Sequence, residues 1–167
     1  WTTMKIPVLS ARPSTLGTTD VDVRSYTSKE VHDLEVERMW KRVWQWACRL
    51  EEIPNVGDHV VYDIAHLSVI VVRAEAGDGP DAIRAFHNVC LHRGTQLRMQ
   101  SGNVPKFRCP FHAWTWNLDG TLDWVACDWD FPQVTADPSA YSLPDVRIGV
   151  WQGFVFVNLN PDAEPLE

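Results

Sequence analysis

The chain has 167 residues, of which 45% are hydrophobic and 22% charged, as expected for a globular protein with one core of about 100–200 residues and a modest extension. Its formal net charge of −7 argues against a nucleic-acid partner, because binding to phosphates requires clustered Lys and Arg. Apolar runs such as 69–72 are far shorter than the ~20 residues that cross a bilayer, so no membrane association is expected.

The N-terminal segment 1–26 is predicted to be an extended arm. It shows no hydrophobic period and contains Pro7 and Pro13. The pattern changes at Thr27-Ser28-Lys29-Glu30, which has the form of a capping box. In such a box the Thr and Glu side chains satisfy backbone donors of the first helical turn, so a helix is expected to begin here.

A helix over 27–49, packed on the domain, is predicted from apolar residues at three- and four-residue steps. These residues are Val36, Met39, Trp40, Val43 and Ala47. The chain has nine Trp, and three of them (Trp40, Trp44 and Trp46) lie on this segment. We expect this Trp stripe to lie in the core, because an aromatic stripe on a helix is more often buried than used to bind a cofactor.

From residue 50 onward, turn residues separate runs rich in Val and Ile, which is typical of short β-strands. The predicted strands are 59–64, 67–73, 83–89, 106–108, 114–117 and 150–158. Residues 78–80 predict a hairpin loop and residues 119–120 a turn. The expected fold class is therefore mainly β, a small antiparallel domain over 50–167 preceded by one helix.

Two of the four cysteines stand alone and two are spaced with histidines. A chain of this length does not need disulfides, so a reducing, cytoplasmic location is expected. Cys48 and Cys127, which have no nearby ligand partner in sequence, are interpreted as buried free thiols.

The chemistry is expected at two short motifs, Cys90-x-His92 and Cys109-x-x-His112, with sixteen residues between them. Each motif follows a predicted strand, and Gly94 and Pro110 favour tight loops. A Rieske [2Fe–2S] cluster takes two thiolates on one iron and two imidazoles on the other. Each loop offers one ligand of each kind, so the four residues are predicted to hold such a cluster.

The same four residues allow two other interpretations. Two unrelated cysteines and two core histidines would have to fall at these spacings by chance. A structural Zn²⁺ also takes two Cys and two His. Zinc-finger spacings usually pair Cys with Cys and His with His, whereas here each loop mixes the two ligand types, which favours the two-iron cluster.

The segments CLHRG (90–94) and CPFHAWTWNLDG (109–120) resemble the Rieske domain of ring-hydroxylating oxygenase large subunits. The resemblance covers roughly 25–165. It implies Cys90, His92, Cys109 and His112 as ligands, with Trp114 as an aromatic cover over the second loop. Arg93 is expected either near the cluster or in a surface ion pair.

Two departures from related patterns are informative. Rieske proteins of respiratory complexes have a further Cys in each ligand loop, and these two cysteines form a disulfide; they also have a Ser after the second loop. In this chain, Phe111 and Trp114 are among the residues at the corresponding positions. With fewer hydrogen bonds to the sulfides, a potential at the low end of the Rieske range is expected, about −150 mV. Ala113 stands where the oxygenase family usually has Gly, and a small backbone adjustment is expected there.

The resemblance implies electron transfer from a ferredoxin or reductase to a mononuclear non-haem iron, held in a catalytic domain of the same or a neighbouring subunit. No His follows His112, so that catalytic domain is expected to be absent from this chain, which alone should not hydroxylate a substrate. The chain would then be part of a larger subunit that forms homo-oligomers and acts in aromatic hydrocarbon catabolism. The alternatives are a freestanding Rieske ferredoxin, against which the helix over 27–49 argues, and a zinc-stabilised interaction module.

Overall fold

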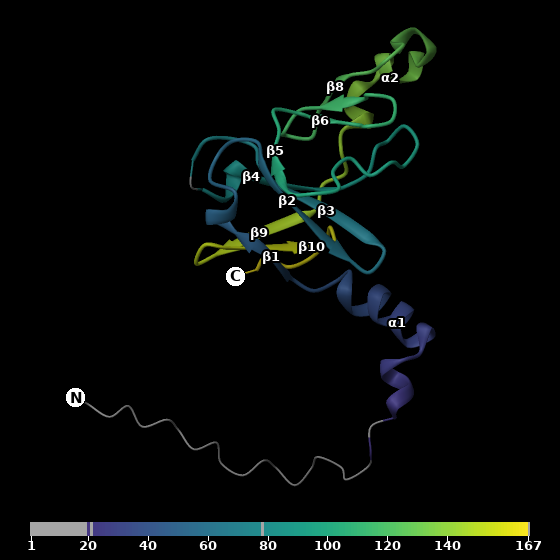
Figure 1. Cartoon of the computed structure of the whole chain (residues 1–167), viewed down its shortest axis with the longest axis vertical. Coiled ribbons are helices and arrows are strands. Elements are labelled where there is room, and N and C mark those ends of the chain that lie inside the picture. The colour runs from purple at the N-terminus through teal and green to yellow at the C-terminus, as the bar shows by residue number, and fades with distance from the viewer. Residues whose placement is uncertain (1–19, 21, 78, 167) are drawn as a thin grey trace, which may run out of the picture. The chain divides into compact units, whose positions relative to one another are not determined.

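The computed structural model describes residues 20, 22–77 and 79–166 (Figure 1). The chain divides into two compact units, 1–33 and 34–167. Most of the predicted extended arm lies outside the described residues. Over Val23–Tyr26 that prediction is wrong, because these residues form a 3-10 helix, η1, capped by the side chain of Asp22. No helix among the described residues has the length and apolar character that a bilayer span requires.

The helix predicted over 27–49 is correct only in its first half. Helix α1 covers Lys29–Glu35 and continues as a π-helical turn, η2 (Val36–Trp40). Its N-cap is Ser28, whose Oγ accepts from the backbone N–H of Val31 at 3.3 Å, so the expected cap at Thr27 is one residue too early.

Beyond the π-helical turn the helix prediction is wrong, because Gln45–Arg49 form strand β1. This strand pairs with β10 (Phe154–Asn158), with Trp46 opposite Phe156. Pairing with a formed sheet and burial of Cys48 beneath it outweigh the helical spacing of the apolar residues. The Trp stripe is therefore not core: Trp46 is 55% exposed, and Trp40 is also exposed.

Three antiparallel sheets make up the second unit, which confirms the mainly β fold class. Their strand orders are β1-β10-β9, β4-β3-β2-β5 and β6-β7-β8. The remaining strands are β2 (Asp58–Ile64), β3 (Leu67–Arg73), β4 (Ile83–His87), β5 (Gly102–Asn103), β6 (Phe107–Arg108), β7 (Thr115–Trp116), β8 (Leu122–Trp124) and β9 (Arg147–Trp151). Short helical segments connect them: η3 (Leu50–Glu52), η4 (Pro80–Ala82), η5 (Asp128–Asp130), α2 (Pro132–Ala136) and η6 (Pro138–Tyr141).

The single strand predicted over 150–158 is two strands in the structure. Strands β9 and β10 are joined by Gln152 and Gly153, which both adopt left-handed backbone conformations, with φ of 50° and 81°. Two consecutive residues of positive φ make the tight hairpin turn whose twist suits antiparallel strands. Apolar residues stand on both sides of Gln152 and Gly153, so the two strands read as one in the sequence.

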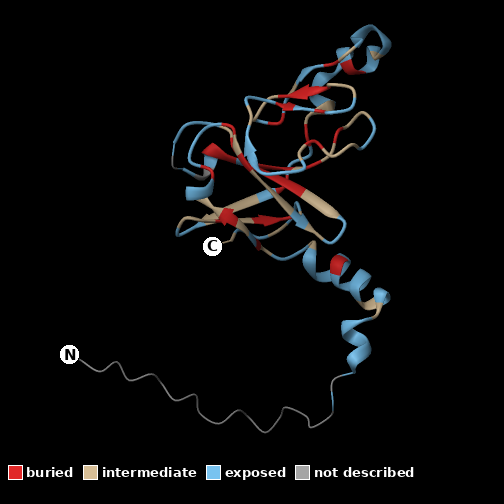
Figure 2. Ribbon diagram, in the orientation of Figure 1, coloured by how far each residue is buried: buried red, intermediate tan, exposed pale blue. Residues whose placement is uncertain are grey.

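Over residues 69–73, strand β3 is buried on both faces (red in Figure 2), and it divides the core in two. Val69 and Val71 belong to a core shared with the β1-β10-β9 sheet. Ile70 and Val72 belong to a second core that also contains Cys90, Cys109 and the aromatic residues of the β6-β7-β8 sheet. The alternation along one strand therefore links the body of the domain to the loops that carry the predicted ligands.

Candidate metal centre

Two short loops carry the four predicted ligands. Loop 1 (residues 90–95) follows β4, and loop 2 (residues 109–114) joins β6 to β7. Both loops have the same backbone hydrogen bonds: the cysteine N–H donates to the carbonyl five residues on, and the cysteine carbonyl accepts from the N–H four residues on. These bonds are Cys90 to Thr95 (2.8 Å) and Gly94 to Cys90 (2.8 Å) in loop 1, and Cys109 to Trp114 (2.9 Å) and Ala113 to Cys109 (3.1 Å) in loop 2.

The residue four positions after each cysteine has positive φ. Gly94 has φ of 74° and Ala113 has φ of 62°. The left-handed conformation is easily adopted by Gly and costs a residue with a Cβ about 1–2 kcal/mol. At Ala113 the turn has the same hydrogen bond as in loop 1, so the alanine itself takes the strained conformation, rather than shifting the backbone as the sequence suggested.

The two loop cysteines are buried and adjacent. Cys90 is 2% and Cys109 3% exposed. Burial raises the pKa of the Cys90 thiol, backbone N–H groups of His92 and Arg93 act in the opposite sense, and a hydrogen bond with the Cys109 side chain raises it further. Two thiols in contact in an apolar core are suitably placed to bind one metal together, because a bound metal ion replaces their protons.

The two loop histidines also lie together, with ring centroids 4.7 Å apart. The His92 ring stacks on Trp114 at 5.0 Å with only 6° between the planes, and Phe131 contacts the same ring edge-on. Burial lowers the pKa of His92, and the neighbouring His112 lowers it further. The neutral imidazole that results is the form that binds metals.

The Nδ1 atom of His92 is buried and has no hydrogen-bond partner. A buried polar atom without a partner is costly and rare in a native protein, and an absent metal or ion is one of its ordinary explanations. Among the described residues, no three His, Cys, Asp or Glu side chains converge as a single bound ion would require. A two-iron cluster needs only two protein ligands on each iron, so a pair of cysteines and a pair of histidines fit it.

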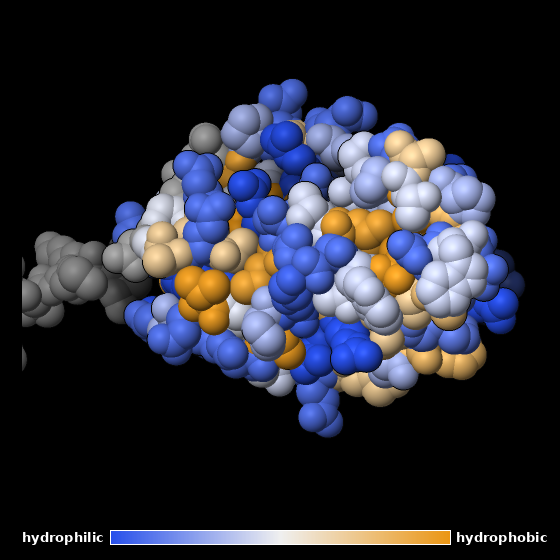
Figure 3. All heavy atoms as spheres, turned by 90° about the horizontal axis from the view of Figure 1, so that it is seen from above, coloured by the Kyte–Doolittle hydropathy of each residue, from blue (hydrophilic) through white to orange (hydrophobic). Residues whose placement is uncertain are grey.

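The second histidine, His112, is half-buried like His92 but has an exposed aromatic neighbour. The His112 ring contacts the ring of Phe111, with centroids 3.8 Å apart, and Phe111 is 63% exposed. Figure 3 views the molecule from the end where β6, β8 and α2 lie in Figure 1 and shows hydrophobic groups separated by hydrophilic ones. The two imidazoles therefore differ: one is enclosed by aromatic rings and the other has an exposed aromatic neighbour.

The two residues predicted to support the ligands have different surroundings. Trp114 is 2% exposed, and it covers the His92 ring of loop 1 rather than the histidine of its own loop. Arg93 is exposed, and no ion pair to it is found in the part of the chain that the structure describes. Its charge contributes to the lowered pKa of His92.

Sequence reasoning missed Phe131, whose ring contacts both His92 and Trp114, at centroid distances of 5.4 and 5.2 Å. It lies between η5 and α2, in a segment without hydrophobic period. An aromatic residue directly before Pro132 was the only available signal.

The two remaining cysteines differ from each other. Cys48 is buried, as predicted, and burial raises the pKa of its thiol to about 12. Cys127 is exposed, so the prediction of a buried thiol is wrong there. Its backbone is left-handed (φ 56°) where the chain turns from β8 into η5, at the surface.

Comparison with known proteins agrees with this geometry. A family model described as a Rieske [2Fe–2S] domain matches residues 43–134. The large subunit of anthranilate 1,2-dioxygenase from Acinetobacter baylyi is 39% identical over 139 residues, which cover 83% of this chain and 28% of that protein. The oxygenase subunit of glycine betaine monooxygenase from Chromohalobacter salexigens is 37% identical over 137 residues, covering 80% and 29%.

Solved structures give the same result. Naphthalene 1,2-dioxygenase from a Rhodococcus species, bound to indole, aligns with a TM-score of 0.73 and 37% identity over 82% of this chain and 31% of that one. A quaternary ammonium Rieske monooxygenase aligns with a TM-score of 0.73 and 30% identity, covering 84% and 38%. The chain thus spans less than two fifths of the length of these relatives, which are oxidoreductase subunits. It belongs to the Rieske [2Fe–2S] domain family, in the branch found in the large subunits of Rieske non-haem iron oxygenases.

Proposed function

We propose that this chain is the electron-entry domain of a Rieske oxygenase large subunit, and that Cys90, His92, Cys109 and His112 hold its cluster. The observation that carries the ligand assignment is the buried, unpartnered Nδ1 of His92, which lies beside a second imidazole. The adjacent cysteines complete a donor set of two sulfurs and two nitrogens. When bound, a cluster of this type accepts and releases one electron at a time.

The protein side chains around this site have separate tasks in the proposal. Trp114 and Phe131 enclose the His92 ring, keep water from it and hold it neutral. Phe111 lies at the surface against the ring of His112. We infer that electrons enter and leave at the His112 edge, because that ring has the exposed neighbour and its contacts can be shared with a partner.

The proposed donor is a ferredoxin or a reductase, and the proposed acceptor is a mononuclear iron in a catalytic domain of the same or a neighbouring subunit. Relatives named as oxygenase subunits support this assignment. The structure of a quaternary ammonium Rieske monooxygenase was described in terms of inter-subunit electron transfer, which supports a homo-oligomeric assembly in which one subunit serves another. A cytoplasmic location is part of the proposal and rests on the interpretation of the cysteines as free thiols.

For the substrate we propose an aromatic ring. The support is the 39% identity to an anthranilate dioxygenase subunit and the 37% identity to a naphthalene dioxygenase structure. Other relatives act on carnitine, glycine betaine or choline. An oxygenase containing this chain, assayed with anthranilate and with glycine betaine, should consume the aromatic compound; turnover of the betaine alone would contradict this part of the proposal.

The ligand assignment is tested by the metal content and spectra of the purified chain. We expect two irons and two sulfides per chain, a Rieske paramagnetic-resonance signal after reduction, and a potential near −150 mV, at the low end of the Rieske range. The variants His92→Ala and His112→Ala should each abolish the visible spectrum. A matched control is His66→Ala, because His66 is exposed and lies on the turn between β2 and β3.

Two outcomes would contradict the assignment. A His92→Ala or His112→Ala variant with an unchanged visible and paramagnetic-resonance spectrum would remove that residue from the ligand set. A colourless wild-type chain with one zinc would establish the zinc-stabilised interaction module instead.

The second candidate function is a freestanding Rieske ferredoxin. The large-subunit relatives favour the oxygenase, but such a carrier would bind the same cluster. The reading frame of the gene decides between them: an oxygenase subunit should continue past codon 167 into a region that encodes two further histidines and a carboxylate for the mononuclear iron.

A further inference from the structure

Asn88, two residues before Cys90, is buried and uses its whole side chain in hydrogen bonds. It is 5% exposed. A carboxamide offers two N–H donors and an oxygen that accepts two bonds. All four are made: Nδ2 donates to Ser68 Oγ (3.0 Å) and to the carbonyl of Arg98 (2.6 Å), and Oδ1 accepts from the backbone N–H groups of Leu97 (3.0 Å) and Arg98 (2.9 Å).

These bonds join the two ends of the segment that contains loop 1. Asn88 precedes the loop, whereas Leu97 and Arg98 follow it. Ser68 lies on β3, the strand that both cores share, and its carbonyl also accepts the backbone N–H of Asn88 at 2.9 Å. One side chain therefore closes the segment 88–98 and fixes it to the centre of the domain.

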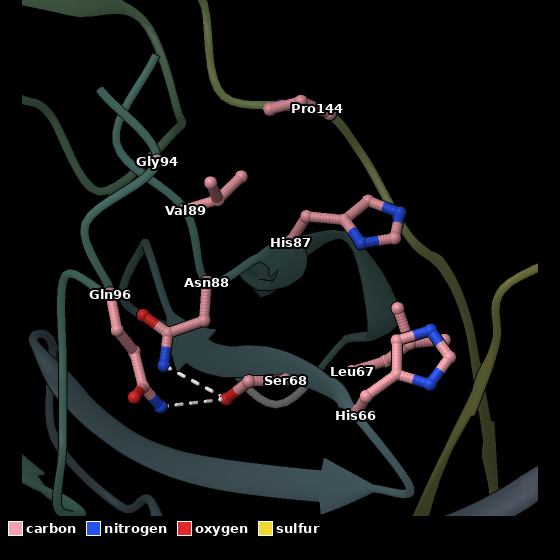
Figure 4. A pocket seen from close by; sticks show the side chains of 9 residues that line it. All are labelled: His66, Leu67, Ser68, His87, Asn88, Val89, Gly94, Gln96 and Pro144. Atoms are coloured by element: carbon pink, nitrogen blue, oxygen red, sulfur yellow. Dashed lines mark hydrogen bonds between the residues drawn. The ribbon is translucent and has the colours of Figure 1, made fainter. Parts of the chain in front are cut away.

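A second amide strengthens the same attachment. Figure 4 shows Asn88 and Gln96 both reaching the hydroxyl of Ser68, in the wall of a pocket of about 420 Å³. Gln96 Nε2 donates to Ser68 Oγ at 3.1 Å. The hydroxyl thus receives one bond from each side of loop 1.

Loop 2 needs no such side chain. Its two ends are strands β6 and β7, which pair directly, with Arg108 opposite Thr115. The strands on either side of loop 1 pair with different neighbours, β4 with β3 and β5 with β2, so no ladder closes that loop. The amide of Asn88 does at loop 1 what strand pairing does at loop 2.

We propose that Asn88 is a positioning residue for the cluster, which acts by holding loop 1 closed so that Cys90 and His92 stay at the spacing the cluster requires. This inference rests on the proposed ligand assignment. Replacement of the amide by a carboxylate turns both donors into acceptors and places an oxygen against the Arg98 carbonyl in a buried site, where an unpaired or repelled polar group is costly. The size of the side chain hardly changes, so the effect comes from the changed hydrogen bonds and the added charge rather than from packing; Ser68→Ala removes hydrogen bonds of the same attachment without adding a charge.

The experiment measures how fast the cluster-loaded chain loses its visible spectrum in the presence of an iron chelator. Asn88→Asp should lose the cluster about tenfold faster than wild type, since the buried bond to the Arg98 carbonyl is lost and two oxygens face each other there. Ser68→Ala should give a smaller increase, and Ser68→Thr, which keeps the hydroxyl, should lose the cluster at a rate close to that of wild type. The matched control is Asn160→Asp, since the Asn160 side chain accepts one bond, from the N–H of Asp162, that a carboxylate can also accept.

The paramagnetic-resonance signal of the cluster that remains separates positioning from general stability. We expect shifted or broadened signals for Asn88→Asp and the wild-type signal for Asn160→Asp. Cluster loss at the wild-type rate in Asn88→Asp would overturn the proposal, and so would faster loss with an unchanged signal. If Asn88→Asp does not fold, the Ser68→Ala and Ser68→Thr pair decides by the same two readouts. A wild-type chain without a two-iron cluster would contradict the proposed function itself, which the metal analysis shows before any variant is made.

Discussion

Loops 1 and 2 have the same backbone turn, but they are held in place by different physical means. In each loop the cysteine N–H and carbonyl make the same two hydrogen bonds, and the residue four positions on is left-handed. Loop 1 is attached by buried polar side chains, with Asn88 at its base. Loop 2 is the end of a β-hairpin whose surroundings are aromatic.

The histidines differ by one position within this shared turn. His92 follows its cysteine by two residues and His112 by three. The first packs among Trp114 and Phe131, and the second contacts exposed Phe111. The turn thus fixes the two cysteines in equivalent places, while the one-residue offset places one imidazole against Trp114 and Phe131 and the other against exposed Phe111. A ring packed against two aromatic side chains is held in place, and an exposed neighbour can meet a partner.

The largest expected effect comes from removing the enclosing aromatic residue. Trp114→Ala deletes a side chain that contacts His92, Phe131 and Tyr141, and truncation of a buried aromatic residue costs about 3–5 kcal/mol. In a chain of this size the midpoint of thermal unfolding should fall by roughly 6–20 °C. Calorimetry or circular dichroism of the cluster-loaded chain measures the shift.

The paired variant is Phe111→Ala, which truncates the exposed aromatic residue of the same loop. Because Phe111 is 63% exposed, its removal should change the midpoint by no more than about 4 °C. The same variant should slow electron transfer from the donor if the His112 edge is the site of exchange. An equal loss of stability in Trp114→Ala and Phe111→Ala would contradict the distinction between a buried and an exposed aromatic residue in loop 2.

Acid should weaken the attachment of loop 1, because Arg98, which follows the loop, is bonded to a buried histidine, His59 on β2. His59 is 1% exposed, accepts from the Nε of Arg98 at Nε2 (3.1 Å), and lies 3.2 Å from the Gly57 carbonyl through Nδ1. Burial lowers the pKa of His59, and the Arg98 charge acts in the same direction. The unfolded chain therefore binds a proton at higher pH than the folded chain does.

The sign of this effect follows from the direction of the pKa shift. Above about pH 6.5, the ordinary pKa of histidine, the stability from neutral His59 is fully present, and it is lost as the pH falls through the folded-state value. One such group contributes at most about 1.4 kcal/mol per pH unit. Between pH 8 and pH 5, the thermal midpoint of His59→Gln should fall less steeply with decreasing pH than that of wild type, because glutamine does not titrate. Burial also lowers the pKa of His87, so part of the slope should remain. A His59→Gln slope equal to that of wild type would rule His59 out as a source.

The sequence predicted the parts of this comparison that depend on local pattern. The ranges of β2 and β3 follow from alternation and β-branched residues, and both are confirmed within one residue. The four ligand candidates were found from spacing, and the structure brings the two histidines together and the two cysteines together. The different aromatic neighbours of the two histidines were not predicted, because they depend in part on Phe131, which is brought to the site from a segment without hydrophobic period.

The errors have a common physical origin in pairing between distant strands. Gln45–Arg49 have helical spacing, but they pair with β10 more than 100 residues away. The turn at Gln152 and Gly153 interrupts an alternation that reads as one strand. The role of Asn88 was also missed, because its partners Ser68 and Arg98 lie 20 and 10 residues away and no local pattern marks a buried side-chain hydrogen bond. Local pattern finds strands and ligands, whereas pairing and buried hydrogen bonds need the fold.

The smallest expected effect tests whether the two turns are equivalent. Gly94→Ala adds a Cβ in open space, with no atom within 4 Å, at a residue with φ of 74°. The strain of about 1–2 kcal/mol is partly offset by the lower entropy of unfolded alanine, so the thermal midpoint should fall by about 2–4 °C. Ala113→Gly releases the strain at φ of 62° in loop 2 and should raise the midpoint by up to about 4 °C. Opposite shifts of the thermal midpoint in the two variants would show that each loop depends on a left-handed residue four positions after its cysteine. A fall in both variants would mean that the Ala113 methyl group contributes packing that outweighs its backbone strain.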